Sequence, residues 1–262
     1  MFLILKINPI WQALIATIFT WSITALGAAL VFFFKKIKKN ILDSMLSISA
    51  GVMIAASFWS LLSPAINMAN NLGLNTILVV SLGFIFGGFF LFISDMIFEL
   101  FQKKQRVSTN KRVLMLVTSI TLHNIPEGLA IGIAFGSTLY GIDGATLMSA
   151  WTLAFGIGIQ NFPEGTAVSV PLRREGFSRK KSFFFGQLSG IVEPISGFLG
   201  ALLVLKIRLI LPFFLAFAAG AMIYVVVSEL IPECQTNKHK GIMSLFVLVG
   251  FIIMMVLDVS LG

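Results

Sequence analysis

Charged residues are scarce in this sequence of 262 amino acids. They make up 11% of the chain, whereas a soluble domain usually carries about 25%. Apolar residues make up 57%, the mean hydropathy is +0.97, and no polar stretch is long enough for a separate soluble domain. Water is therefore not the main solvent of this protein. The single cysteine, Cys234, excludes an internal disulfide and a cluster of thiolate ligands.

Basic residues outnumber acidic ones, and the net charge is +8. Such a charge can indicate nucleic-acid binding, but here the Lys and Arg residues lie almost entirely in short breaks between apolar segments. We therefore expect no nucleic-acid partner. The first apolar stretch is followed by its basic run at residues 35–39, which is the wrong order for a cleaved signal peptide. We interpret this stretch as a retained first span.

The apolar runs between these breaks are long enough to cross a bilayer, which takes roughly 20 residues. The pattern predicts an all-α polytopic membrane protein, with residues 1–262 forming a single transmembrane domain. We expect the lipid bilayer of a cell (plasma or inner) membrane to surround it. The eight predicted transmembrane helices cover residues 8–34, 42–68, 74–98, 112–138, 145–171, 182–205, 209–231 and 241–260.

The basic residues are divided unevenly between the two sides that these spans define. The breaks after the first, third, fifth and seventh spans hold all but three of the 19 Lys and Arg residues, the exceptions being Lys6, Lys206 and Arg208. Cytoplasmic loops carry an excess of Lys and Arg, so these four breaks are predicted to face the cytoplasm. Both termini then face outward, which agrees with an even number of spans.

Three glutamates, Glu127, Glu164 and Glu193, fall near the middle of the predicted spans 112–138, 145–171 and 182–205. An ionisable group at that depth costs ~2.5–3.5 kcal/mol on insertion scales. No Lys or Arg lies at a similar depth to neutralise the carboxylates. A bound cation is the simplest partner, and we place a metal site on these three spans.

Two of these glutamates belong to motifs with the chemistry and spacing of metal ligands. In each motif a neutral ligand lies four residues before the glutamate, on the same helical face, and an asparagine lies one residue further on. Imidazole, carboxylate and amide oxygens together suit zinc, iron(II), manganese or cadmium. A lone histidine could instead be a hydrogen-bonded core residue, but the repeated spacing favours ligation. The six residues are His123, Asn124 and Glu127 in the first motif and Gln160, Asn161 and Glu164 in the second.

A proline directly precedes each of the two glutamates, at Pro126 and Pro163. Proline has no N–H and leaves one carbonyl of the preceding turn unbonded, so both helices are predicted to kink or break beside the ligands. The two N-x-P-E-G motifs also form an internal repeat on consecutive, oppositely directed spans. An axis in the membrane plane then relates them, an arrangement that many secondary transporters use at midplane sites.

The motifs HNIPEG and QNFPEG, followed by Glu193 in VEPISG, resemble those of the ZIP family of metal transporters. The Gln160-Asn161 pair is most similar to the GufA-like branch, and the resemblance covers the whole chain, including the segment Ala50–Met53 in the second span. It implies a 3+2+3 helix arrangement with an N-out/C-out topology. It also implies that the chain moves zinc, or alternatively iron, manganese or cadmium, toward the cytoplasm. Because the ion is cargo, we expect no catalytic cofactor.

The resemblance further implies a binuclear metal site at the midplane, in which Glu127 and Glu164 bridge two ions. Many family members have histidine, or an acid after the glutamine, where this chain has Gln160 and Asn161. The first ion would be held by His123, Glu127, Gln160 and Glu164. The second would be held by Asn124, Glu127, Asn161, Glu164 and Glu193.

Three further residues are candidates for an ion pathway. Glu229 in the seventh span and Glu233 one turn later could pass ions toward the cytoplasm, although an ordinary interfacial charge explains them equally well. Met53 could line the pathway, although packing is its more usual role. Two small-residue patterns allow close helix contacts, which we assign to packing within the chain in preference to a homodimer: Gly83-x-x-x-Gly87 and Gly186-x-x-x-Gly190.

Two other classes of function compete with metal transport. A proton or alkali-cation channel would use the buried glutamates alone and would not need His123 or the amides. An intramembrane zinc hydrolase would need a His-Glu-x-x-His motif, which the sequence lacks. A serine hydrolase pairing Ser189 with His123 would leave three glutamates unexplained. We therefore expect a transporter and not an enzyme.

Overall fold

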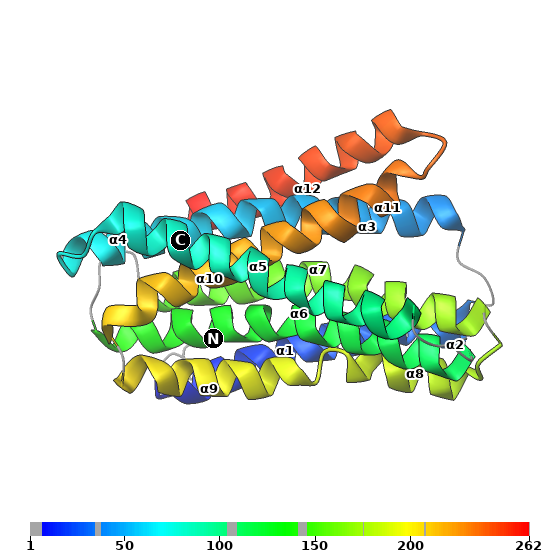
Figure 1. The fold of residues 1–262 in the computed structure, drawn as a ribbon, viewed down its shortest axis with the longest axis horizontal. Helices are drawn as coiled ribbons and strands as arrows, with labels where there is room; N and C mark the ends of the chain where they lie inside the picture. The colour runs from blue at the N-terminus through cyan, green and yellow to red at the C-terminus, as the bar shows by residue number, and fades with distance from the viewer. Residues whose placement is uncertain are drawn as a thin grey trace.

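The computed structural model describes residues 7–34, 38–103, 109–140, 146–174, 176–206 and 208–261. All regular secondary structure in these ranges is helical, and the helices run along the longest axis of one bundle (Figure 1). The predicted all-α class is confirmed. The α-helices are α1 (Pro9–Ala28), α2 (Leu30–Phe33), α3 (Lys39–Ala56), α4 (Ser63–Asn71), α5 (Thr76–Lys103), α6 (Thr109–Ser137), α7 (Leu147–Arg174), α8 (Arg179–Leu188), α9 (Val192–Lys206), α10 (Leu211–Val225), α11 (Ile231–Gln235) and α12 (Lys240–Leu261).

The helical stretches agree with the predicted spans to within a few residues at most ends. α6 and α7, which carry the two N-x-P-E-G motifs, are not among the stretches that stand out by length and apolar composition, so the count of eight spans stays a prediction. Within the described residues, six stretches are long and apolar enough to cross a bilayer: Pro9–Phe33, Lys39–Asn71, Thr76–Ile97, Arg179–Val204, Leu211–Gln235 and Lys240–Ser260. The chain is an integral, multi-pass membrane protein.

Short π-helical turns interrupt two of the long stretches, each just before a proline. The turn η2 (Ser57–Leu62) precedes Pro64, and the turn η5 (Val226–Leu230) precedes Pro232. A π turn adds one residue to the helical repeat. In both places the helix therefore continues beyond the proline without a loop.

The helices do not break at Pro126 and Pro163, and the predicted kinks stay a prediction. Both prolines lie inside continuous helices, α6 and α7, because a helix held by neighbouring helices tolerates the loss of one backbone hydrogen bond. The interruption lies instead in the predicted span 182–205, where α8 ends at Leu188 and α9 begins at Val192. The non-helical residues between them place Glu193 in the first turn of α9.

Glycines set several of the closest helix contacts, and they act within the chain. A Cβ atom at Gly87 of α5 would lie 1.9 Å from the carbonyl oxygen of Phe217 in α10, and one at Gly83 would lie 2.4 Å from that of Phe213. A Cβ atom at Gly186 of α8 would lie 2.7 Å from Ala28 of α1. Both glycine patterns therefore serve packing within the chain, as the sequence analysis favoured.

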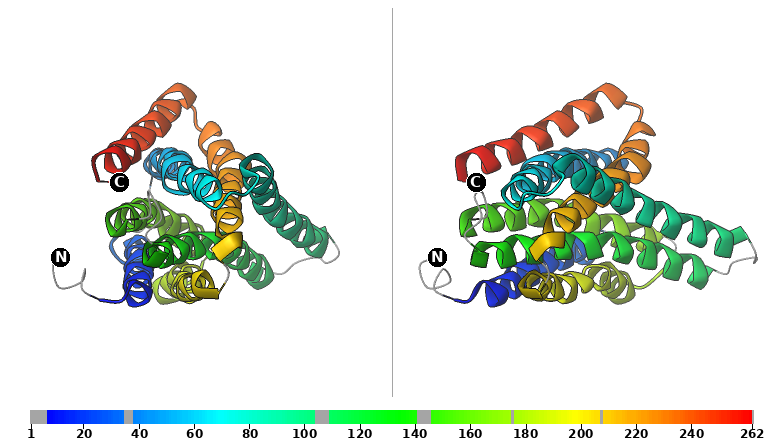
Figure 2. Two further views of the ribbon diagram at one scale, coloured as in Figure 1. Left: turned by 90° about the vertical axis from the view of Figure 1, so that its left-hand side faces the viewer. Right: turned by 60° about the vertical axis from the view of Figure 1, so that its left-hand side comes forward.

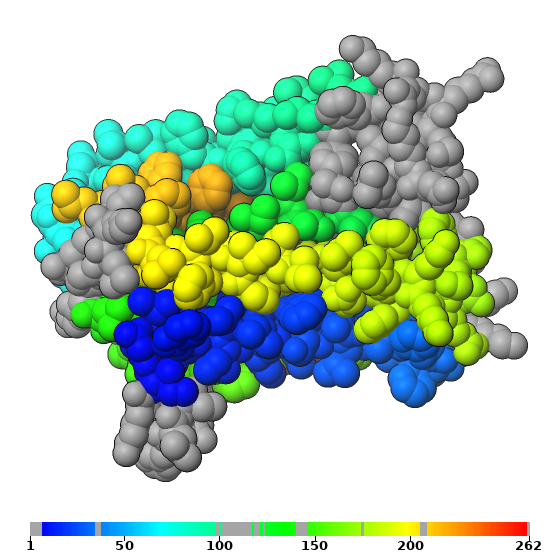
Figure 3. All heavy atoms as spheres, turned by 90° about the horizontal axis from the view of Figure 1, so that it is seen from below, coloured from blue at the N-terminus to red at the C-terminus, as the bar shows by residue number. Residues whose placement is uncertain are grey.

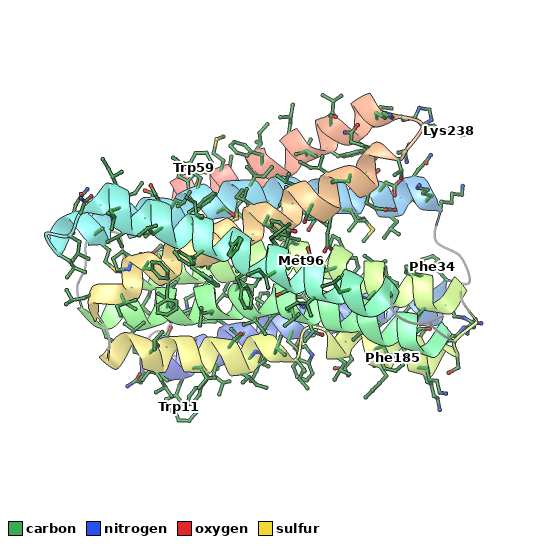
Figure 4. The ribbon with its side chains drawn as sticks, viewed as in Figure 1. Trp11, Phe34, Trp59, Met96, Phe185 and Lys238 are labelled. Carbon is green, nitrogen blue, oxygen red and sulfur yellow. The ribbon has the colours of Figure 1, made fainter. Side chains whose placement is uncertain are left out.

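The helices fall into two groups around the candidate site. Figure 2 shows α1, α6, α7 and α9 together, with α3, α10 and α12 on the other side of the bundle. The breaks near Phe34 and Lys238 lie at one end of the bundle, and Trp11 and Trp59 lie toward the other (Figure 4). α1 begins and α12 ends on the side away from Lys238. The basic breaks after the first and seventh predicted spans thus lie at the same end of the bundle.

Candidate metal centre

The glycine that closes each N-x-P-E-G motif brings a neighbouring helix close to the glutamate before it. A Cβ atom at Gly128 would lie 2.5 Å from the carbonyl oxygen of Glu193, so α6 and α9 meet at Glu127. A Cβ atom at Gly165 would lie 2.0 Å from the carbonyl oxygen of Thr24, so α7 and α1 meet next to Glu164. The repeat therefore has a packing function in addition to its predicted ligand role.

The two motifs contact each other directly across α6 and α7. Gln160 Nε2 donates a hydrogen bond to Glu127 Oε1 at 2.5 Å, and both side chains are buried. In the sequence, only the family resemblance joined these two residues, as ligands of the same ion. The structure brings them together as one group.

Glu193 forms a second buried group with Asn161 of the second motif and with α1. Asn161 Nδ2 donates to both carboxylate oxygens of Glu193 at 2.9 Å. Thr20 Oγ1 of α1 donates to Glu193 Oε2 at 2.5 Å. The first-turn position of Glu193 in α9 also suits a carboxylate, because the N-terminal end of a helix favours negative charge.

Thr20 was not identified from the sequence. Thr17, Thr20 and Thr24 recur on one face of an apolar span, and all three are fully buried. A polar stripe on a predicted membrane helix is a signal for a polar partner inside the bundle. The sequence could not indicate which partner that was, because Glu193 lies 173 positions away.

Asn124 is held at the interruption between α8 and α9. Its Nδ2 donates to the backbone carbonyl of Ser189 at 3.0 Å, and the side chain is 1% exposed. The unpaired backbone at Ser189 thereby gains a partner. Asn124 thus links α6 to the segment that leads into Glu193.

Glu164 is less buried than the other two glutamates and faces a cavity of about 560 Å³. Glu229 and Glu233, the predicted pathway acids, line the same cavity, as does Thr236, two residues before Lys238. The cavity therefore extends from the candidate site to the end of the bundle that holds the Lys238 turn. The charges of Glu127, Glu193 and Glu229 are close enough to interact with that of Glu164.

Met53, the remaining pathway candidate, is fully buried in the apolar core of the bundle. It is not among the residues that line the cavity beside Glu164. In this structure it has the packing role that the sequence analysis regarded as the more usual one.

Four oxygen atoms of the candidate ligands are buried without a hydrogen-bond partner: Asn124 Oδ1, Glu127 Oε2, Gln160 Oε1 and Asn161 Oδ1. Buried polar atoms normally have partners because leaving one without is costly. Carboxylate and amide oxygens are suitable partners for a divalent cation. The set therefore fits a cation as its missing partner.

The carboxylates do not by themselves form a metal cluster. Among the described side chains, no group of three or more His, Cys, Asp or Glu residues could hold a metal ion. His123 lies in α6, but its side chain lies outside the described part of the chain. The ligand set that the structure does describe thus depends on the amides as much as on the acids.

Comparison with known proteins decides the family. The family model described as ZIP Zinc transporter matches residues 102–258, which is more than half of the chain. The chain belongs to the ZIP zinc transporter family. Its ZIP relatives include "Zinc transporter ZIP11" of Homo sapiens, which is 38% identical over 97% of this chain and 98% of the relative. "Zinc transporter GufA" of Myxococcus xanthus is 31% identical over 95% of this chain and 98% of the relative.

A third ZIP relative, "Zinc transporter ZIPB" of Bordetella bronchiseptica, is 34% identical over 91% of this chain and 78% of the relative. The resemblance seen in the sequence motifs, including the one to the GufA branch, is therefore confirmed. The relatives are named as transporters and not as enzymes.

Proposed function

We propose that this ZIP protein transports divalent transition-metal cations, zinc foremost and also iron, manganese or cadmium, across the membrane toward the cytoplasm. The observation that carries the proposal is the set of four buried oxygens without partners on Asn124, Glu127, Gln160 and Asn161. These atoms come from both N-x-P-E-G motifs, and the Gln160–Glu127 hydrogen bond joins the motifs where α6 and α7 meet. Cations bound there would supply partners for these oxygens.

The proposed site consists of two adjacent ligand groups. His123, Glu127, Gln160 and Glu164 would hold the first ion. A second ion would use Asn124, Asn161 and Glu193, with the glutamates of α6 and α7 bridging the pair. Mutual interaction of Glu127, Glu164 and Glu193 supports their placement in one site, since a cation between them would relieve their repulsion.

The proposed route runs lengthwise through the bundle. The cavity lined by Glu164, Glu229 and Glu233 would carry the ion from the site to the Lys238 end. A smaller cavity of about 190 Å³, lined by Trp59 and Asp258 among others, lies toward the opposite end. The excess of Lys and Arg assigns the Lys238 end to the cytoplasm. Eight spans in a 3+2+3 arrangement, with both termini outside, complete the proposed topology.

The test is uptake by purified protein in proteoliposomes. Accumulation of radiolabelled zinc, cadmium, manganese and iron(II) is expected, with empty liposomes as the control. Metal uptake that depends on Glu127 and Gln160 would support the proposal. A proton or alkali-ion current with no metal uptake would instead support a channel, and peptide cleavage without uptake would support a hydrolase.

A further inference from the structure

Thr20 of α1 is bonded to both members of the Asn161–Glu193 pair. Its hydroxyl donates to Glu193 Oε2 at 2.5 Å, and its backbone carbonyl accepts from Asn161 Nδ2 at 3.2 Å. We infer that Thr20 is a positioning residue that holds Glu193 against Asn161 and thereby weakens binding of a second ion. This inference rests on the proposed function, because it concerns the Glu193 side of the same site.

In the structure, both oxygens of the Glu193 carboxylate accept hydrogen bonds from protein donors. Oε1 accepts from Asn161, and Oε2 accepts from Asn161 and Thr20. N–H and O–H donors direct positive charge at the carboxylate, as a cation would. The carboxylate is therefore satisfied without metal, in contrast to Glu127, whose Oε2 has no partner.

The Asn161 amide faces Glu193 with the wrong group for a metal. Its Nδ2 donates to the Thr20 carbonyl and to both oxygens of Glu193, whereas Oδ1, the atom that can bind a cation, has no partner. An ion on Glu193 and Asn161 needs this amide to turn so that Oδ1 replaces Nδ2. The turn breaks the bonds to Glu193 and the bond to the Thr20 carbonyl together.

The surroundings leave little freedom for that turn. Thr20, Asn161 and Glu193 are all fully buried. Figure 3 shows α1 side by side with α8 and α9 on one face of the molecule. Gly165 and Gly190 hold the helix backbones within contact of Thr24, and Thr24 Oγ1 donates to the Thr20 carbonyl at 3.3 Å. Release of the Thr20 hydroxyl from Glu193 removes one of the bonds that hold this group in its metal-free arrangement.

The test compares Thr20→Val with wild type in full-length, detergent-purified protein titrated with cadmium. Valine keeps the shape and removes the hydroxyl. Isothermal titration and equilibrium dialysis together give the number of bound ions and each dissociation constant. We expect wild type to bind one ion tightly and a second weakly, and Thr20→Val to bind the second at least about tenfold more tightly, the scale of one charge-assisted hydrogen bond.

Two controls separate positioning from general damage. Thr20→Ser keeps the hydroxyl and should show the wild-type ratio of the second dissociation constant to the first. Thr17→Val makes the same change one turn earlier on α1, where the hydroxyl donates to the carbonyls of Ala13 and Leu14. It should leave the ratio of the two dissociation constants unchanged. A structural defect would lower both affinities and the melting temperature together.

The cadmium titrations distinguish failure of the Thr20 proposal from failure of the proposed function. A second-ion affinity in Thr20→Val equal to that of wild type, or an equal shift in Thr17→Val, overturns the role of Thr20. Failure of wild type itself to bind cadmium overturns the proposed function instead. The two failures are thus distinguishable in one set of titrations.

Discussion

Gln160 Nε2 lies 2.5 Å from Glu127 Oε1, so the first candidate ligand group contains a donor bonded to an acceptor across two helices. Gln160 Oε1, the atom that can bind a cation, has no partner. In the proposed site, the Gln160 amide would therefore have to turn so that Oε1 replaces Nε2 toward the ion, and the Asn161 amide would have to turn in the same way in the second group. A side chain at position 160 that can bind metal without an amide rotation should therefore bind it more readily.

Gln160→His tests this relationship. Neutral imidazole is a better zinc ligand than an amide and presents a ring nitrogen without an amide rotation. We expect the affinity for zinc to rise by about tenfold, equivalent to ~1.4 kcal/mol, while the maximal uptake rate falls because release is slower. Equilibrium titration and initial-rate uptake measure the two separately. An unchanged zinc affinity would show that residue 160 does not contact the ion.

Glu164→Ala tests the shared carboxylate. Glu164 faces the large cavity, and its charge interacts with those of Glu127 and Glu193. In the proposed site it is, with Glu127, one of the two acids that both ions share. We expect uptake to fall by about a hundredfold or more, because one lost ligand carboxylate costs several kcal/mol in a poorly solvated site. Membrane insertion, followed by surface labelling, should not change. Uptake at the wild-type rate would contradict the shared site.

Gly165→Ala tests the contact between α7 and α1. A Cβ atom there would lie 2.0 Å from the Thr24 carbonyl oxygen, and overpacking of this kind costs ~1–3 kcal/mol. We expect a lower melting temperature in detergent. Gly241→Ala is the matched control, because no atom lies within 4 Å of its Cβ position. Equal melting temperatures for both variants would mean that α1 moves to accommodate the added methyl group without a loss of stability.

Glu229→Gln tests the proposed exit. Glu229 lines the same cavity as Glu164, but Glu164 lies in α7 and Glu229 lies in the π-helical turn η5. We expect the maximal uptake rate to fall by about tenfold, equivalent to a barrier increase of ~1.4 kcal/mol, because the cavity loses one of its acids. Equilibrium cadmium affinity should change much less, since the proposed ligands remain. If affinity fell and rate at saturation did not, Glu229 would belong to the binding site and not to the exit.

The sequence by itself determined the helical class, the positions of the helical stretches and the placement of three glutamates within those stretches. These features are local, since a run of apolar residues long enough to cross a bilayer must pair its backbone internally. The N-x-P-E-G repeat was visible for the same reason, as each motif lies on one or two turns of a single helix. The ligand types followed from the residue types alone.

Only the tertiary structure decided which of these residues contact each other. The sequence placed the helix breaks at Pro126 and Pro163, whereas the interruption lies before Glu193, where backbone groups find a partner in Asn124. The role of Thr20 was also undecided, because its partner Glu193 is 173 positions away in the chain. Contacts of this kind depend on how closely helix backbones approach, and that approach is set by glycines on neighbouring helices acting together, not by any one segment.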